Sequence, residues 1–226
     1  MLTLILAEAE LETIPSELLY HPLIVSSARQ KGKNPAQIIL DSNYHHKAMT
    51  QLSEGTRRGR PDIVHVFLLT ALESIVNKQG YLNIMIHTRY NQVITVNPET
   101  RIMRNYDRFI GLLEQLFEHH VVPKDGTPLL KLQSNQSLQQ LVDEATADHV
   151  IACSRTGKTT NLHNYLTELK KQQPHHIVCI IGGFPSGTFH TDMTTITPHV
   201  LSLYKEMLSV WTVASEVLVN YEVAAL

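Results

Sequence analysis

Short apolar runs of strand length alternate along this chain with stretches in which apolar residues recur at helical spacing. The strand-like runs are "LTLILA" (2–7), "AQIILD" (36–41), "YLNIMIHT" (81–88), "QVITVNP" (92–98), "PLLKLQ" (128–133), "HVIACS" (149–154) and "HIVCIIGG" (176–183). This alternation predicts an α/β fold. A chain of 226 residues is long enough to bury one full core, so we expect a single domain over 1–226.

The pattern also predicts where the order departs from simple alternation. Only "RYN" separates the runs at 81–88 and 92–98, which predicts a β-hairpin inserted at about 81–97. Helices are predicted for "PDIVHVFLLTALESIVNKQG" (61–80), "RFIGLLEQLFEHH" (108–120) and "LSVWTVASEVLVNYEVAAL" (208–226). The last of these is apolar on more than one face, and we expect it to cover the core or a partner subunit.

Composition narrows the class of protein. A content of 43% hydrophobic and 18% charged residues is typical of a soluble globular chain. The first apolar run lacks a basic leader and no run approaches the roughly 20 apolar residues of a membrane span, so we expect a cytoplasmic protein without a membrane anchor. Cys153 and Cys179 lie in strand-like runs and are interpreted as buried thiols. The His, Cys and acidic residues show no metal-ligand spacing, so no metal site is predicted.

Residues 152–160, "ACSRTGKTT", match the sequence motif [A/G]xxxxGK[S/T] of a phosphate-binding loop. In such a loop, backbone N–H groups cradle the phosphates, the lysine reaches the outer phosphates and a hydroxyl holds Mg²⁺. The flanking "DHVIACS" and "TTNLHNYLTELKKQ" fit a strand and a helix. However, no strand ends in the acidic residue that would complete the Mg²⁺ site. A nucleotide triphosphatase acting through residues 152–159 is therefore an alternative rather than the main interpretation.

Arginines cluster twice, in "RRGRPD" (57–62) and in "TRIMRNYDR" (100–108). If the second stretch is helical from about Glu99, its three arginines lie on one face. Because guanidinium groups grip phosphate bidentately, two such clusters in a chain of net charge -2 indicate an anionic ligand, with RNA the natural one. The alternative is a solvated face paired with Glu99 and Asp107.

Two further features remain open from the residues alone. Asp62 stands two residues after Arg60, where it could pair with that arginine, cap a helix or act as a general base. "IIGGFPSGTF" places three glycines after an apolar strand, which allows a sharp turn and close approach to a ligand. This glycine spacing does not match the dinucleotide fingerprint GxGxxG.

Five segments together resemble one family. They are "DSNYHHKAM", "RRGRPDIVH", "VNPETRIMRNYDRFIGLLEQL", "IGGFPSG" and "LSLYKEMLSVWTVASE". Taken together they resemble the ribosome-biogenesis pseudouridine N1-methyltransferases, the nucleolar-essential-protein family of the SPOUT superfamily, in an archaeal form. The resemblance extends over nearly the whole chain.

This resemblance implies a SPOUT-type α/β fold with a C-terminal trefoil knot, an exception to the rule that chains are not knotted. It implies S-adenosylmethionine as the cofactor, held by the glycine loop and by the turn before the last helix. Transferred to this chain, the cofactor residues are Gly182, Gly187, Leu203, Tyr204, Lys205, Glu206, Met207 and Leu208. The turn departs from the Asn-Tyr-Pro pattern that is more usual in the family, so the resemblance supports backbone contacts there more than side-chain contacts.

The resemblance also implies N1-methylation of a pseudouridine in small-subunit ribosomal RNA by a homodimer, with ribosome assembly proteins as further partners. The RNA-gripping arginines of the family correspond to Arg60, Arg101, Arg104 and Arg108, and Asp62 corresponds to the acid that holds the first of them. A carboxylate already paired with an arginine is a weak base, so orienting Arg60 is the favoured role. The alternative function is an RNA-binding assembly factor with little catalysis.

Overall fold

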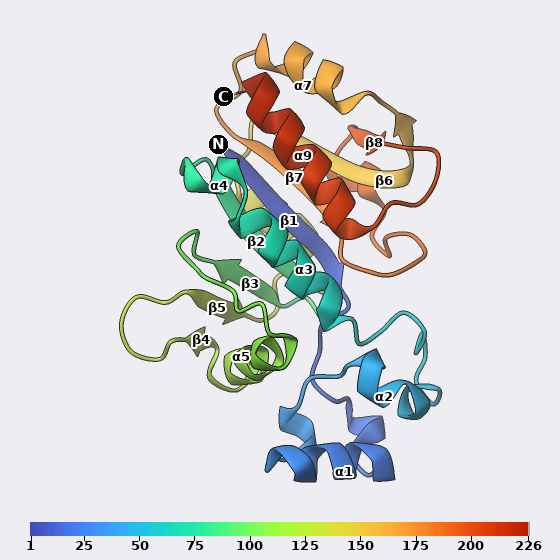
Figure 1. The fold of residues 1–226 in the computed structure, drawn as a ribbon. Coiled ribbons are helices and arrows are strands. Elements are labelled where there is room, and N and C mark those ends of the chain that lie inside the picture. Colours follow the sequence, from blue (N-terminus) through green and yellow to red (C-terminus); the bar gives the residue numbers. More distant parts are fainter. Residues whose placement is uncertain (226) are drawn as a thin grey trace.

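An eight-stranded sheet forms the centre of the computed structural model, which describes residues 1–225 (Figure 1). The strands are β1 (Leu2–Ala9), β2 (Leu82–Thr88), β3 (Val93–Val96), β4 (Val121–Val122), β5 (Leu130–Gln133), β6 (His149–Thr159), β7 (Ile177–Gly182) and β8 (Val200–Ser202). Their order across the sheet is β4-β5-β3-β2-β1-β7-β6-β8. Strands β2, β1, β7, β6 and β8 are parallel, whereas β3, β5 and β4 pair antiparallel. The predicted α/β class is confirmed.

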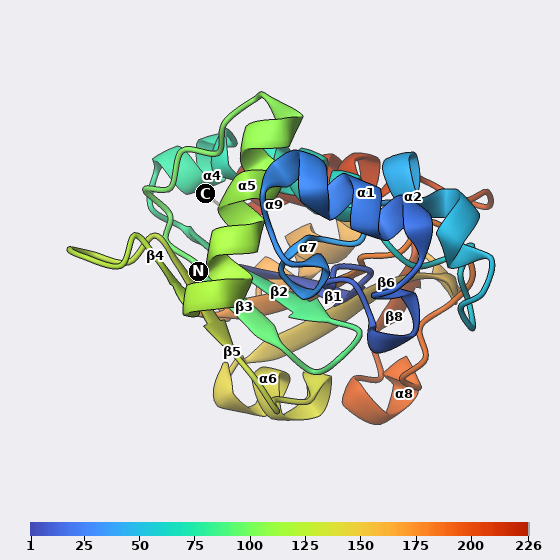
Figure 2. The same cartoon turned by 90° about the horizontal axis from the view of Figure 1, so that it is seen from below.

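Helices cover both faces of this sheet (Figure 2). The helices of the described residues are η1 (Ser16–Leu18), α1 (Pro22–Lys31), η2 (Pro35–Gln37), α2 (Ser42–Met49), α3 (Pro61–Leu72), α4 (Ile75–Lys78), α5 (Tyr106–His119), α6 (Leu138–Glu144), α7 (Leu162–Lys170), α8 (Met193–Ile196) and α9 (Val210–Ala225). Helices α3, α5, α7 and α9 share the main apolar core with one face. Helices α6 and α8 pack on the other face. The sheet is thus the middle of three layers, which suits strands whose side chains are buried on both sides.

The segment between β1 and α3 forms a small helical lobe of its own, at the bottom of Figure 1. Ile14, Leu18 and Ile24 belong to its separate apolar cluster. The strand predicted at 36–41 is wrong, because this run contributes a short η2 helix and a single bridge between Thr13 and Ile39. Its isoleucines are buried all the same, since the lobe and the main core enclose them in place of neighbouring strands.

Local capping explains where the other helices begin and end. The helix predicted over 61–80 is two helices, because the Ser74 side chain accepts a hydrogen bond from the N–H of Asn77 and starts a new turn. Helix α5 begins at Tyr106 after the Asn105 side chain caps the N–H of Arg108. Helix α9 agrees with the predicted terminal helix, of which residue 226 lies outside the described residues.

The region predicted as an inserted hairpin consists of β2 and β3, which pair antiparallel with Ile84 opposite Val96. Strand β2 is also parallel to β1, so the hairpin extends the sheet and does not project from it. The trefoil knot stays a prediction of the resemblance. No helix within residues 1–225 has both the length and the apolar character needed to span a membrane.

Candidate functional site

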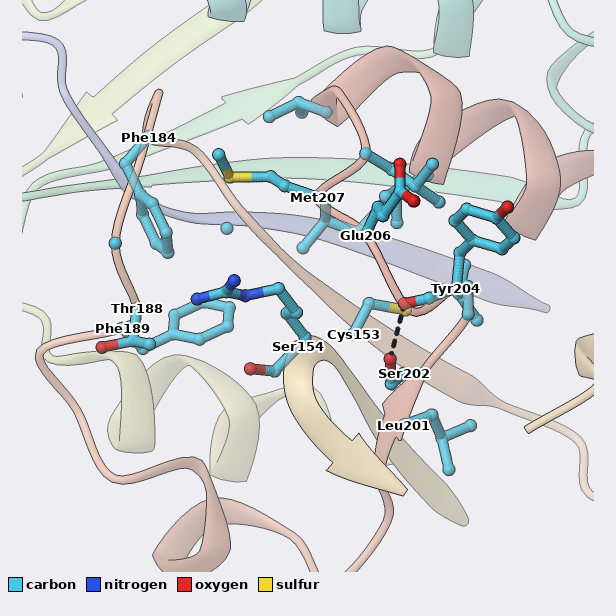
Figure 3. A pocket seen from close by; sticks show the side chains of 18 residues that line it. Cys153, Ser154, Phe184, Thr188, Phe189, Leu201, Ser202, Tyr204, Glu206 and Met207 are labelled. Atoms are coloured by element: carbon cyan, nitrogen blue, oxygen red, sulfur yellow. Dashed lines mark hydrogen bonds between the residues drawn. The ribbon is translucent and has the colours of Figure 1, made fainter. Parts of the chain in front are cut away.

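A pocket opens at the carboxyl ends of β7 and β8, beside the middle of β6 and the turn that leads into α9 (Figure 3). Its walls come from residues within 153–155, 181–189 and 201–208, together with Val210 and Val213 of α9. Parallel strands commonly present ligand sites at their carboxyl ends, because the loops that leave them diverge there. The fold therefore brings together one strand segment and the two loops that follow β7 and β8.

The pocket unites most of the residues that were transferred from the family. Those that line it are Gly182, Gly187, Leu203, Tyr204, Glu206, Met207 and Leu208. Lys205 is not among the lining residues, and its exposed ammonium lies 3.9 Å from Glu206. The turn itself is held by Ser202, whose hydroxyl donates to the Tyr204 carbonyl at 2.9 Å.

Sequence reasoning missed two aromatic rings of the glycine loop. Phe184 and Phe189 meet edge to face in the pocket wall, with centroids 5.2 Å apart and planes at 90° (Figure 3). Their position within "GGFPSGTF" was a usable signal, since aromatic residues beside loop glycines offer flat apolar surfaces to a ring-containing ligand. Cys153, Ser154 and Arg155 of β6 were also missed as lining residues.

The loop glycines are needed for close approach and for backbone conformation. A Cβ at Gly183 would lie 2.7 Å from the Cα of Ala9, so the loop can cross the end of β1 only with glycine there. Gly187 has φ +86, a conformation that residues with side chains rarely adopt. Two backbone hydrogen bonds fix the crossing, from the N–H of Gly183 to the Ala7 carbonyl and from the N–H of Glu10 to the Gly183 carbonyl.

Arg60 and Asp62 form a bidentate pair at the start of α3, with N···O distances of 2.8 and 2.7 Å. Asp62 is the second residue of the helix and makes no capping bond with its side chain. Its hydrogen bonds raise the pKa of Arg60 and hold the guanidinium in one orientation. The N–H of Arg60 donates to the Glu10 carbonyl, so this arginine is two backbone hydrogen bonds from Gly183 of the pocket.

Arg101, Arg104 and Arg108 are all exposed, but they do not lie on one helix. The prediction of a helix from Glu99 is wrong, since residues 101–103 are irregular and α5 begins only at Tyr106. Just before this segment, the Thr100 hydroxyl donates a hydrogen bond to the carbonyl of Leu129, the residue that precedes β5.

None of these three guanidiniums, within residues 1–225, has a hydrogen-bond or ion-pair partner. The alternative interpretation paired them with Glu99 and Asp107, and the structure does not form those pairs. Two arginines in an irregular segment and one in the first turn of α5 therefore present free positive charge to solvent. This arrangement suits contact with phosphates along a nucleic-acid backbone.

The first arginine cluster divides into different roles. Arg57 and Arg58 are only 8% and 3% exposed. The clustering had indicated that they contact an anionic ligand, and for these two arginines that prediction is wrong. Arg58 forms a bidentate pair with the buried Glu12 at 2.8 and 2.5 Å. Arg57 pairs with Glu10 at 2.6 Å. Of the three arginines in this cluster, Arg60 alone has a side chain that remains partly exposed to solvent.

The phosphate-loop interpretation of residues 152–159 is wrong. Strand β6 runs on to Thr159, and Lys158 pairs with Leu201 of β8 where a phosphate loop would turn. A Cβ at Gly157 would lie 2.6 Å from the carbonyl of Val200, so this glycine permits close contact between two strands. Helix α7 begins later, at Leu162, behind its own asparagine cap. Lys158 and Thr159 are therefore not at a helix N-terminus and cannot bind phosphate there.

The two cysteines lie side by side in the core, as free thiols with their sulfur atoms 3.8 Å apart. Their burial was predicted and is confirmed. The hydrogen bond with Cys153 and the burial raise the pKa of the Cys179 thiol, which keeps it protonated and unreactive. Among residues 1–225 there is no group of three or more His, Cys, Asp or Glu side chains arranged to hold a metal ion.

Comparison with known proteins gives a consistent result. The chain matches the family described as "EMG1/NEP1 methyltransferase" over residues 4–222. It is 46% identical to a "Ribosomal RNA small subunit methyltransferase Nep1" of Methanothrix thermoacetophila, over 98% of this chain and 96% of that protein. It is also 46% identical to the protein of the same name from Pyrococcus furiosus, over 98% of this chain and 96% of that protein.

A solved structure shares the fold as well as the sequence. The crystal structure of Archaeoglobus fulgidus Nep1 bound to S-adenosylhomocysteine superposes with a TM-score of 0.85 and 32% identity. The match covers 98% of this chain and 97% of that one. The whole fold, including the pocket at the carboxyl ends of the strands, thus lies within the compared region.

Proposed function

The chain belongs to the EMG1/NEP1 methyltransferase family, and we propose that it methylates N1 of a pseudouridine in small-subunit ribosomal RNA with S-adenosylmethionine as methyl donor. One observation carries this proposal. The chain superposes over almost its full length on a relative bound to S-adenosylhomocysteine, and it has a pocket lined by the glycine loop and the turn before α9.

The pocket residues fit such a donor. Phe184 and Phe189 offer aromatic surface for a purine ring, and Gly182 and Gly187 line the pocket without side chains of their own. Glu206 and Met207 line the pocket from the turn before α9. When bound, S-adenosylmethionine supplies an electrophilic methyl group on a sulfonium sulfur.

The protein itself contributes mainly position. Methyl transfer forms a bond from N1 to the methyl carbon while the carbon–sulfur bond breaks, and the N1 proton leaves to solvent or to a base. Holding the two reactants in line converts an encounter between molecules into a step within one complex, which supplies a large part of a rate enhancement. Asp62 is proposed to act through Arg60, because both its oxygens already accept hydrogen bonds from that guanidinium.

The exposed arginines supply the contacts with RNA. Arg60 precedes α3 and is oriented by Asp62, whereas Arg101 and Arg104 precede α5 and Arg108 lies in its first turn. We propose that they bind phosphates of a structured loop, so that the target base turns outward toward the pocket. The backbone hydrogen bonds from Arg60 to Glu10 and from Glu10 to Gly183 support this proposal, because they connect Arg60 to the loop that lines the pocket.

The first test needs no RNA. Calorimetric titration with S-adenosylhomocysteine should show about one site per chain, while Mg·ATP should show no binding, because Lys158 and Thr159 are committed to strand pairing. Binding of Mg·ATP alone would overturn the assignment.

The second test addresses the modified atom. Matched RNA hairpins can carry pseudouridine, uridine or N1-methylpseudouridine at one loop position. Only the pseudouridine base has a free N1–H that a methyl group can replace. Transfer of labelled methyl to the pseudouridine hairpin alone is the expected result. Equal labelling of the uridine hairpin would contradict the proposed specificity.

We also propose that the enzyme is a homodimer. Trp211, Val219 and Val223 are apolar side chains of α9 that are 39%, 57% and 67% exposed. Exposed apolar side chains on a helix are more stable when a second copy covers them. Sedimentation equilibrium should give twice the chain mass, and Val219→Glu should shift it toward the monomer. A wild-type monomer at micromolar concentration would contradict the dimer.

Its place in the cell follows from the substrate. A small-subunit RNA is modified where subunits are assembled, so we propose a cytoplasmic enzyme that meets ribosome assembly proteins on the precursor. Co-sedimentation with immature small subunits, and its absence from mature ones, is the expected observation.

A further inference from the structure

Arg57 is a buried arginine whose contacts reach the wall of the cofactor pocket. Its Nε donates to Glu10 at 2.6 Å, and its Nη1 donates to the carbonyl of Thr188 at 2.8 Å. The same Nη1 lies 3.5 Å from the carbonyl of Ser186, and the guanidinium stacks 4.0 Å from the centre of the Phe184 ring. One side chain thus touches three residues of the glycine loop while it is itself anchored to the end of β1.

A second anchor holds the far end of the same loop. The Glu8 carboxylate accepts hydrogen bonds from the N–H groups of His190 and Thr191 at 2.7 and 2.8 Å. Glu8 also lies 3.5 Å from Nη2 of Arg57. The carboxylates of Glu8 and Glu10 together compensate the buried guanidinium, which needs paired charge to be tolerated in the core.

The loop needs this support. Residues 186–188 are exposed to solvent, and Gly187 adds conformational freedom. The next regular element, helix α8, begins only at Met193. Between Gly183 and that helix, the guanidinium of Arg57 and the carboxylate of Glu8 tie the loop to the end of β1 by hydrogen bonds. A loop that is ordered before the ligand arrives loses less conformational entropy on binding.

We infer that Arg57 is a positioning residue for the cofactor. It holds the loop from Phe184 to Thr188 in the conformation that binds the S-adenosyl group, without itself lining the pocket. This inference rests on the proposed function, because it requires that the pocket binds that ligand. The same segment carries Arg60, so the anchor also ties the cofactor loop to the RNA-binding surface.

The adjacent Arg58 provides a matched control. It is buried and paired with an acid in the same way, but its partners are Glu12 and Tyr90 and it makes no hydrogen bond to the glycine loop. Arg57→Lys keeps the positive charge beside Glu10 while losing the second donor and the flat group that stacks on Phe184. Arg58→Lys makes the same chemical change without affecting the loop.

Calorimetry with S-adenosylhomocysteine measures the effect. We expect Arg57→Lys to raise the Kd about tenfold, the size of change that loss of a charge-assisted contact produces, and Arg58→Lys to leave it within about twofold. Methyl transfer should show a raised KM for the donor with kcat restored at saturation. Equal Kd values for Arg57→Lys and wild type would overturn the inference, as would equal increases in both variants.

Hydrogen exchange locates the effect in the chain. The amides of His190 and Thr191 are protected by Glu8, and the loop before them is held by Arg57. Arg57→Lys should speed exchange in peptides covering 184–191 and leave the β1 and β7 peptides unchanged. Exchange that quickens throughout the protein would indicate a general loss of stability and would contradict a positioning role.

Phe184→Leu keeps the inference testable if Arg57→Lys folds poorly. This variant removes the ring beneath the guanidinium and leaves the buried ion pairs intact. Because Phe184 also lines the pocket, the decisive measurement is hydrogen exchange without ligand in peptides covering 184–191. Unchanged exchange in these peptides would count against the anchor. Failure of the wild-type protein itself to bind S-adenosylhomocysteine would instead refute the proposed function.

Discussion

Buried His45 makes the stability of the protein depend on pH in a calculable way. It lies on α2 and is 1% exposed, its Nδ1 accepts the N–H of Asp41 at 3.1 Å, and its Nε2 lies 3.2 Å from the Ser27 hydroxyl. Burial, and next the charge of Lys31, lower the pKa of His45 from 6.5 to about 4, against the opposing charge of Glu114. The folded protein therefore keeps this imidazole neutral.

The sign and size follow from linkage. Between pH 6.5 and about 4 the unfolded chain binds a proton at His45 that the folded chain does not bind, so stability falls as the pH is lowered. The loss from this one group is about 2 kcal/mol at pH 5 and about 3 kcal/mol at pH 4. Above pH 7 the contribution is complete and constant.

Urea unfolding at pH 7.5, 6 and 5 measures this loss. His45→Gln removes the titrating group. From pH 7.5 to pH 5, the unfolding free energy of the wild type should therefore fall by about 2 kcal/mol more than that of the variant. The neighbouring exposed His46 is the control, and His46→Gln should run parallel to wild type. Parallel profiles for His45→Gln and wild type would refute the buried, neutral imidazole.

Three further changes test other parts of the structure. Arg101→Ala should flatten the slope of log affinity for RNA against log salt by about 0.7 to 0.9, while Lys78→Ala should leave it unchanged. In thermal unfolding, Gly157→Ala should destabilise the protein by about 1–3 kcal/mol, because the new Cβ meets the β8 backbone. Its control is Gly111→Ala, which places a Cβ in open space on α5 and should stabilise the protein by about 0.5–1 kcal/mol. Asp62→Asn should weaken RNA binding about tenfold in a filter assay with no change in S-adenosylhomocysteine affinity, and an equal loss of both would contradict its orienting role.

The sequence alone determined the features that depend on local pattern. The apolar runs of β1 and β7 and the spacing of α5 and α9 predicted elements that the structure confirms, because burial of one face or both imposes a period on the residues themselves. The family was also evident, since long stretches such as "RPDIVH" are specific as sequence. These properties need no knowledge of which segment lies beside which.

Tertiary structure alone decided the features that depend on a distant partner. Residues 155–159 are polar and resemble a phosphate loop, yet they continue strand β6, because β8 supplies backbone partners to Lys158 and Thr159. Neighbouring arginines separated by only one glycine took opposite roles, because Glu12 is buried beside Arg58 while Arg60 has only Asp62 at the surface. Hydrogen-bond partners and compensating charges come from residues dozens of positions away, and no local pattern records them.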